Sequence, residues 1–146
     1  MIHVKVPAVP PSYLADMNER PLIDSRSAGT VSLPAETQFA ENGIVSRTLL
    51  RTPTVRVVLF GFAEGQELTE HTSTQEALVQ ILSGQCEFVL DGEPRQLKTG
   101  DLVFMPTNLP HSVRATESFS MLLTLSKPES RREKQTKAGA ASVVGV

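Results

Sequence analysis

Two histidines in matching sequence contexts are the residues of this chain that are best suited to chemistry. His71 ends an alternating segment that follows Gly65, and His111 ends a similar segment that follows Gly100. Imidazole is the commonest side-chain metal ligand and suits zinc, copper, nickel and iron. A catalytic metal site normally needs three protein ligands and an open position. The two histidines therefore point to a polar site but do not complete a metal centre.

The composition is that of one soluble domain. The chain has 146 residues, of which 40% are hydrophobic and 21% are charged. A net charge of -2 gives no electrostatic reason to expect nucleic acid or an anionic membrane as a partner. No apolar run approaches the roughly 18 residues that a membrane-spanning helix needs. With Cys86 as the single cysteine, an internal disulfide is excluded, and we expect a cytoplasmic protein.

The segments that must position the histidines have the pattern of β-strands. Beyond Ile44, β-branched and aromatic residues gather in short runs separated by turn residues, without a convincing helical period. Asp91-Gly92 is typical of a tight hairpin turn, because a type I′ turn needs positive φ at both central positions. The pattern predicts an all-β fold, a small antiparallel barrel or jelly roll of seven or eight strands. The expected strands are 44–50, 54–62, 77–82, 86–90, 94–98, 101–105, 111–115 and 119–125.

The two ends of the chain differ from this middle part. Residues 1–40 hold five of the ten prolines and predict an irregular arm that packs on the domain or on a neighbouring subunit. The barrel domain is expected over 41–126, and a flexible, solvated tail over 127–146. Exposed sheet edges together with the arm favour a homodimer, because a second subunit would cover an edge.

The two histidine blocks resemble the two sequence motifs of the cupin superfamily. The first motif reads G-x5-H-x-H-x3-E-x6-G and the second G-x5-P-x-G-x2-H-x3-N. Asn108 stands at the inner glycine of the second motif, which is physically reasonable because Asn tolerates left-handed backbone. The resemblance implies a small single-domain cupin barrel from about residue 44 to 125. The matching residues are Gly65, His71, Gly84, Gly100, Pro106 and His111.

The sequence departs from these motifs at two metal-ligand positions. Ser73 stands at the second histidine and Ala77 at the glutamate, so the resemblance transfers only His71 and His111 as ligands. Gln75 or Glu76 would have to supply the third ligand, although alternation directs Glu76 away from the face of Ala77. The resemblance implies at most one divalent metal ion (Zn, Ni, Fe or Mn).

Three functions compete. In the first, the barrel binds a small molecule, with His71 and His111 as polar anchors and with Ser73 and Met105 as further ligand contacts. In the second, the chain resembles metal-dependent cupin enzymes of the dioxygenase, isomerase or decarboxylase type. In the third, the barrel is an oligomerisation unit whose histidines fill its interior.

Three further groups complete the list of candidates. Alternation places Cys86 on the face of Phe88, which predicts a buried small hydrophobe rather than a reactive thiol. Arg47, Arg51 and Arg56 are expected to face solvent, although an arginine that pointed inward would pair with a carboxylate ligand bidentately. On one extended strand, Ser73 would share a face with His71, which would allow a hydrogen bond between them.

Overall fold

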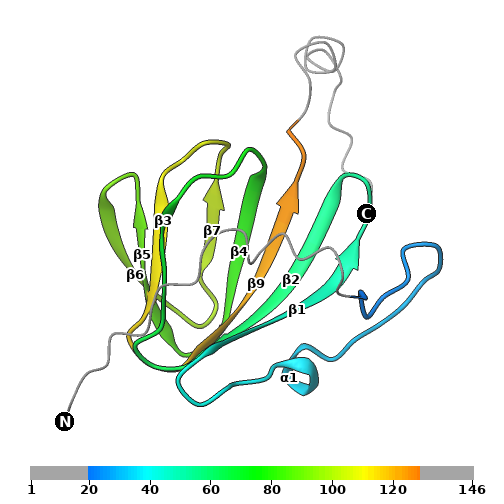
Figure 1. Ribbon diagram of the computed structural model, residues 1–146, viewed down its shortest axis with the longest axis horizontal. Coiled ribbons are helices and arrows are strands. Elements are labelled where there is room, and N and C mark those ends of the chain that lie inside the picture. Colours follow the sequence, from blue (N-terminus) through cyan, green and yellow to red (C-terminus); the bar gives the residue numbers. More distant parts are fainter. Residues whose placement is uncertain (1–19, 129–146) are drawn as a thin grey trace.

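The computed structural model describes residues 20–128, which form nine β-strands and one short helix (Figure 1). The elements are α1 (Leu33–Glu36), β1 (Ile44–Arg51), β2 (Val55–Phe62), β3 (Glu67–His71), β4 (Glu76–Ser83), β5 (Gln85–Leu90), β6 (Glu93–Lys98), β7 (Leu102–Met105), β8 (His111–Ala115) and β9 (Phe119–Ser126). The eight expected strands are all present, and each boundary lies within one residue of the expected one. The ninth strand, β3, is the alternating segment that ends at His71; it was not among the expected strands, and Leu68 is its only buried residue.

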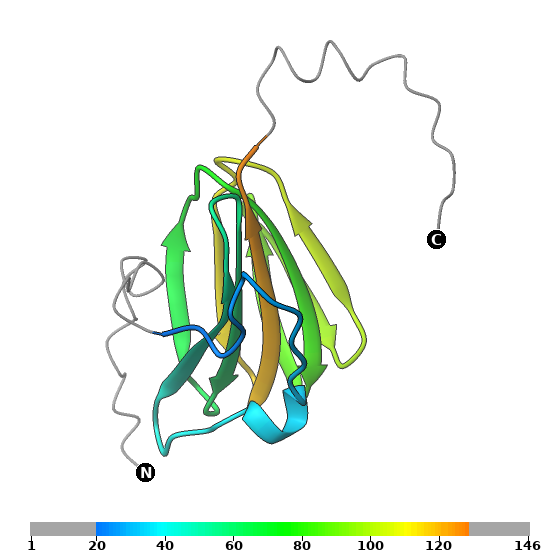
Figure 2. The same ribbon diagram turned by 90° about the vertical axis from the view of Figure 1, so that its right-hand side faces the viewer.

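The strands form two antiparallel sheets. One has five strands in the order β1-β2-β9-β4-β7, and the other has four in the order β3-β8-β5-β6. Figure 2 shows the two sheets facing each other, with the core between them. The predicted all-β, jelly-roll class is confirmed.

Aromatic side chains fill one end of the space between the sheets. Phe60, Phe62 and Phe119 are fully buried, and the rings of Phe62 and Phe119 stack with centroids 4.5 Å apart. Burying each such ring contributes roughly 1.5–3 kcal/mol. Phe62 ends β2 and pairs with Phe119 at the start of β9, so this aromatic end is closed. The opposite end, where β2 begins and β9 ends, is free to hold a cavity.

The turns between the strands have the backbone that their residues predict. Asp91 (φ 50) and Gly92 (φ 80) confirm the expected positive-φ pair, and Asn108 has the left-handed φ of 64 expected of it. Gly84 combines a φ of 75 with close packing, because a Cβ there would overlap the carbonyl oxygen of Ser118. This last glycine of the first motif is therefore required by both conformation and space.

The described part of the N-terminal arm packs on the barrel of its own chain. The Ile23 N–H donates to the Leu49 carbonyl oxygen at 2.8 Å, which places this part of the arm beside β1. The backbone of Gln38 crosses β2 so closely at Gly61 that no side chain would fit there. The predictions for residues 1–19 and 129–146 lie outside the described residues. At the other end, the Lys127 N–H donates to the Thr54 carbonyl oxygen at 3.0 Å.

The outer face of the five-stranded sheet exposes apolar side chains near its β7 edge. Leu102 is 60% exposed and Phe104 is 57% exposed, and Leu78 lies opposite Phe104 on β4. Such a face suits contact with a second copy, so the homodimer stays a prediction that size-exclusion chromatography can test. In the part of the chain that the structure describes, no helix has the length and apolar character needed to cross a membrane.

Candidate functional site

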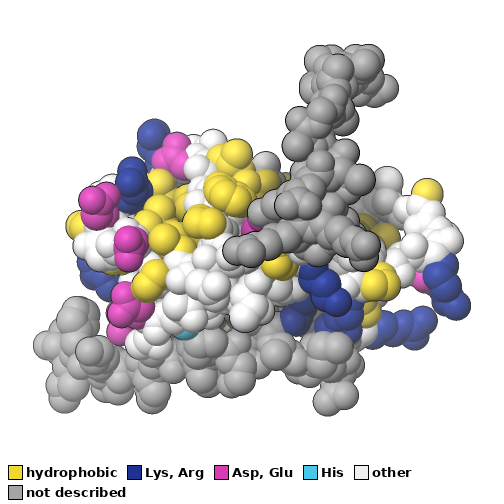
Figure 3. All heavy atoms as spheres, turned by 90° about the horizontal axis from the view of Figure 1, so that it is seen from above, with side chains coloured by type: hydrophobic (Ala, Val, Ile, Leu, Met, Phe, Trp, Pro, Cys, Tyr) yellow, Lys and Arg dark blue, Asp and Glu magenta, His cyan; other side chains and the backbone are white. Residues whose placement is uncertain are grey.

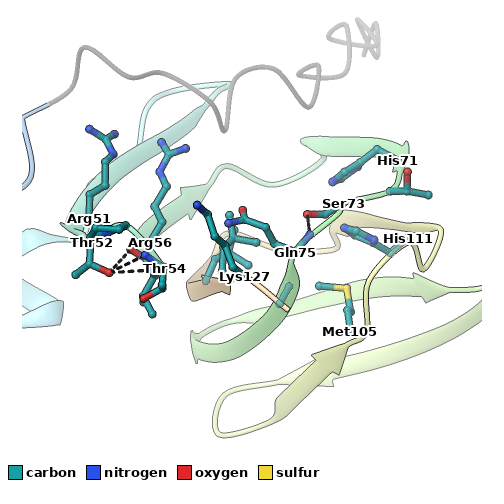
Figure 4. Close-up of a pocket in the computed structure, with 16 residues that line it drawn as sticks. Arg51, Thr52, Thr54, Arg56, His71, Ser73, Gln75, Met105, His111 and Lys127 are labelled. Atoms are coloured by element: carbon teal, nitrogen blue, oxygen red, sulfur yellow. Dashed lines mark hydrogen bonds between the residues drawn. The ribbon is translucent and has the colours of Figure 1, made fainter. Parts of the chain in front are cut away.

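A cavity of about 710 Å³ occupies the end of the barrel opposite the aromatic end (Figure 4). It is bounded by the start of β2, the end of β9, the end of β3, and the starts of β4 and β8. Exposed Thr54 and Lys127 mark where it meets solvent. The lining residues are Arg51, Thr52, Pro53, Thr54, Val55, Arg56, His71, Thr72, Ser73, Gln75, Ala77, Met105, His111, Leu123, Leu125 and Lys127.

The two motif histidines meet in this cavity. His71 and His111 are direct partners across the antiparallel strands β3 and β8. Their ring centroids lie 4.2 Å apart, with an angle of 59° between the ring planes. The convergence expected of inward-facing residues in a closed barrel is therefore present for this pair.

Backbone hydrogen bonds determine which nitrogen of each ring carries a proton. The Nδ1 atom of His71 lies 2.7 Å from the Thr69 carbonyl oxygen, and that of His111 lies 2.8 Å from the Leu109 carbonyl oxygen. A carbonyl oxygen only accepts, so both Nδ1 atoms must donate. In each neutral ring, Nε2 is left as an acceptor or a metal ligand.

Burial favours the neutral form of His111. The side chain is buried, and its desolvation lowers the pKa of the imidazole below its usual value. The hydrogen bond to Leu109 raises this pKa, and the charge of a protonated His71 lowers it further. Neutral imidazole is the form that accepts a hydrogen bond or coordinates a metal through Nε2.

The loops that carry the histidines are tied together by the backbone. The Asn108 N–H, in the loop before His111, donates to the Ser73 carbonyl oxygen at 2.7 Å. The Ser73 hydroxyl accepts from the Gln75 N–H at 3.1 Å. The expectation that Ser73 shares an extended strand with His71 is wrong, because β3 ends at His71 and Ser73 lies in the following loop.

The metal donors offered by this end are few. Gln75 and Ser73 line the cavity, as does Met105, whereas Glu76 does not and instead lies on β4 opposite Ser126. Within residues 20–128, no group of three His, Cys, Asp or Glu side chains is arranged to hold a metal ion. The side chains present therefore fall short of a centre with three strong protein ligands, since Gln75 would add only a neutral amide oxygen.

Sequence reasoning missed the cations of the cavity. Arg51 and Arg56 were expected to face solvent, but both line the cavity, and Lys127 joins them from the segment assigned to the tail. Arg47 is not among the lining residues. The available signal was the short Thr52–Thr54 connection, which makes the two arginines direct cross-strand partners in a hairpin. In Figure 4 their side chains extend from this hairpin in the same direction, far from the histidine rings.

Cys86 takes no part in the site. It is fully buried in the core, and burial, with a smaller contribution from the charge of Asp101, raises the pKa of its thiol to about 12. The prediction of a buried small hydrophobe is confirmed, since a thiol with so high a pKa is a poor nucleophile at neutral pH.

Comparisons with known proteins place this barrel in a family. Residues 58–125 match the model of the Cupin domain. The pectin degradation protein KdgF of Dickeya dadantii is 30% identical over 97 residues, which cover 64% of this chain and 88% of that protein. An uncharacterized protein of Aquifex aeolicus is 31% identical over 80 residues, 55% of this chain. The match spans 65% of the Aquifex protein's length.

A solved structure agrees with these sequence matches. The SPY1581 protein of Streptococcus pyogenes, described as a conserved protein of unknown function, superimposes with a TM-score of 0.67 at 33% identity. The alignment covers 79% of this chain and 99% of that one. The family model, the KdgF match and this shared barrel together show that the chain belongs to the cupin superfamily, as a small single-domain cupin.

Proposed function

We propose that the protein binds a small organic molecule in the barrel cavity, with His71 and His111 as polar anchors. The observation that carries this proposal is the cavity itself. Its volume of about 710 Å³ lies in the range of pockets that enclose small ligands. Apolar side chains such as Leu123 and Leu125 form much of its wall, and a few polar groups converge at one end.

The histidine rings suit this role because their free nitrogens have a defined character. With Nδ1 held by a backbone carbonyl, the Nε2 of each neutral ring accepts a hydrogen bond from a ligand hydroxyl or amine. Each such bond contributes roughly 0.5–1.5 kcal/mol. Ser73 and Met105 line the same end, and supply a hydroxyl and an apolar contact. Similarity to a protein named for pectin degradation also supports a small-molecule role.

The test is a thermal-shift screen of small organic molecules against protein treated with a chelator. A ligand that binds the native state raises the melting temperature. We expect compounds that do so without metal, and we expect His71→Ala and His111→Gln to abolish their effect. Glu76→Gln is the matched control, because Glu76 lies close in sequence but does not line the cavity. A screen in which the histidine variants respond like the parent protein would contradict the role of the histidines.

A metal-dependent enzyme is the second candidate, and one observation favours it. Metal-binding histidines characteristically donate their second ring N–H to a carbonyl or carboxylate, as both rings do here. His71 and His111 would hold the ion, with Gln75 as the third protein ligand. A bound ion would act as a Lewis acid or as an oxygen-activating centre.

Metal analysis separates the two candidates. Protein purified without chelator would contain near one equivalent of zinc, nickel, iron or manganese if the enzyme candidate holds, and His111→Gln would remove it. We expect instead that the purified protein is substoichiometric in metal, because two strong ligands hold a divalent ion weakly.

A further inference from the structure

Two walls of different chemistry meet at the histidine end of the cavity. His71 and His111 come from β3 and β8 of the four-stranded sheet. The other wall comes from the five-stranded sheet, where Met105, Ala77 and Leu125 are successive partners across β7, β4 and β9. These three residues, the apolar strip, line the cavity with buried side chains. This end therefore has two imidazoles on one side and a hydrocarbon surface on the other.

Ala77 leaves room in the middle of the apolar strip. It has the smallest side chain of the three and stands between the larger side chains of Met105 and Leu125. The cupin motif has a glutamate at this position, and a carboxylate there would fill the space with a charged group. With alanine, the strip can accommodate a flat apolar ring. The Met105 thioether adds to this fit, because sulfur makes favourable contacts with the edge of an aromatic ring.

The neutral histidine pair offers a ligand only hydrogen-bond acceptors. Each Nδ1 donates to a backbone carbonyl oxygen, so Nε2 is the nitrogen left to accept. Burial favours the neutral form of His111. His111 is buried and His71 is half-buried, and little histidine surface is visible in Figure 3, which views this end from above. A ligand of this pair must therefore bring the protons itself, through groups such as hydroxyls.

The two acceptors are close enough for one ligand to use both. His71 and His111 are direct partners across β3 and β8, with ring centroids 4.2 Å apart. Hydroxyl groups on neighbouring carbons of a ring lie side by side and can reach both imidazoles. Hydroxyl groups on opposite carbons of the same ring point in opposite directions, so only one of them reaches the pair. The spacing of the imidazoles thus favours a vicinal diol.

We propose that this end of the cavity binds aromatic vicinal diols, of which catechol is the simplest. The two hydroxyls donate to the Nε2 atoms of His71 and His111, and the flat ring lies against the apolar strip at Ala77. Both hydrogen bonds are made directly to the imidazoles, so this binding needs no metal ion. The inference rests on the proposed function, since it names the class of ligand for the same cavity.

The test compares matched probes by ligand-observed NMR on chelator-treated protein, under nitrogen because catechols oxidise in air. Catechol and hydroquinone are isomers that differ only in the position of the second hydroxyl, and phenol and guaiacol each have one hydroxyl. We expect catechol to bind roughly two- to tenfold more tightly than each of the others, which corresponds to one further net hydrogen bond. A buffer of about pH 7.5 lies above the ordinary imidazole pKa of about 6.5 and so favours the accepting form.

Variants assign the preference to residues. His71→Phe and His111→Phe each keep a planar ring but remove one acceptor, so catechol and hydroquinone should then bind equally. Ala77→Leu fills the space on the apolar strip and should weaken catechol binding at least tenfold. Gln80→Leu is the matched control, because Gln80 is exposed on the same strand and does not line the cavity. Circular dichroism and the melting temperature establish that each variant is folded.

The outcomes separate this inference from the function beneath it. If catechol and hydroquinone bind the parent protein equally, the vicinal-diol preference is wrong while a small-molecule cavity stands. If cis-1,2-cyclohexanediol binds as tightly as catechol, the aromatic part of the inference is wrong. Catechol binding that appears only after nickel or manganese is added would overturn the direct contact with the imidazoles. If no probe binds, the inference fails, and if no compound in the wider screen binds either, the proposed function fails with it.

Discussion

The two ends of the cavity differ in how freely their side chains move and in the charge they carry. At the histidine end (His71 and His111), rings on adjacent strands are held by bonds to backbone carbonyls, so little freedom remains to be lost. At the cationic end (Arg51, Arg56 and Lys127), long side chains extend from a hairpin and from the end of β9. Ordering one such side chain costs up to roughly 2 kcal/mol of rotamer entropy. The histidine end is preorganised, and burial there favours the neutral form of His111, whereas the cationic end is adaptable and charged.

The largest expected effect is a gain in metal affinity when the missing metal ligands are added at the histidine end. Ser73→His/Ala77→Glu supplies the two ligands that the motifs have at these positions, and both residues line the cavity. We expect nickel or manganese affinity to rise at least a hundredfold over the parent protein. At a free metal concentration near one hundred times Kd, the native state gains roughly 2.7 kcal/mol, which a melting curve detects.

One outcome would contradict this prediction. If the parent protein already binds metal as tightly as the double variant, two histidines suffice. The contrast between a hydrogen-bonding end and a metal centre would then disappear. Ser73→Ala/Ala77→Gln serves as the control, because it changes the same positions without adding a charged or imidazole ligand.

A smaller effect separates the two ends by stability. His111→Ala should lower the free energy of unfolding by roughly 1–3 kcal/mol, because it removes a buried side chain and its hydrogen bond. His71→Ala, on a more exposed side chain, should cost less than about 1 kcal/mol, and Arg51→Gln about 0.5 kcal/mol or less. Urea unfolding followed by circular dichroism gives the ranking. Equal losses at both ends would show that the histidine end is not preorganised by packing.

Ionic strength should act on one end alone. Raising salt to about 0.5 M shortens the screening length to a few ångströms, so binding of an anion such as benzoate at the cationic end should weaken several-fold. Benzamide binding should hardly change, because it uses no charge. Titrations at low and high salt measure both. A benzoate affinity that is independent of salt would show that the cationic end does not contribute to benzoate binding.

The smallest effect concerns a residue outside both ends. Because Cys86 is buried and the pKa of its thiol is raised to about 12, DTNB should modify it only as fast as the core opens. A ligand bound to the closed barrel should slow this reaction by the same factor by which it lowers the population of the opened state. Fast modification of the native protein would show that the barrel opens locally near β5.

The sequence revealed the barrel and the histidine end because both leave local signals. The alternation of strands, the Asp91-Gly92 turn and Asn108 each have a conformational cause that acts within a few residues. The cationic end leaves a weaker signal: the short Thr52–Thr54 connection pairs Arg51 with Arg56, but arginine on a strand is compatible with either face. Only the pairing of Arg51 with Arg56, and the return of the chain to Lys127, place these charges together.

The strand β3 is a second feature that the sequence pattern alone did not predict. Its sequence ELTEH alternates but has a single apolar residue, Leu68, so its hydrophobic pattern is too weak to separate a strand from a loop. It forms because β8 offers backbone partners to it, which is a tertiary effect. The prediction that Ser73 lies on the same strand as His71 was wrong for the same reason. The end of β3 is determined by its pairing with β8 and not by local residue preference.

The β1–β2 hairpin has a consequence for how this barrel can change over evolutionary time. Two of the three cations lie on either side of its turn, whereas the histidines lie in the other sheet. Substitutions at 51–56 therefore alter the wall of the cavity on one sheet and leave β3 and β8, which hold the imidazoles, in the other. Under the proposed function, relatives that share the two histidines but differ in this hairpin should accept different molecules.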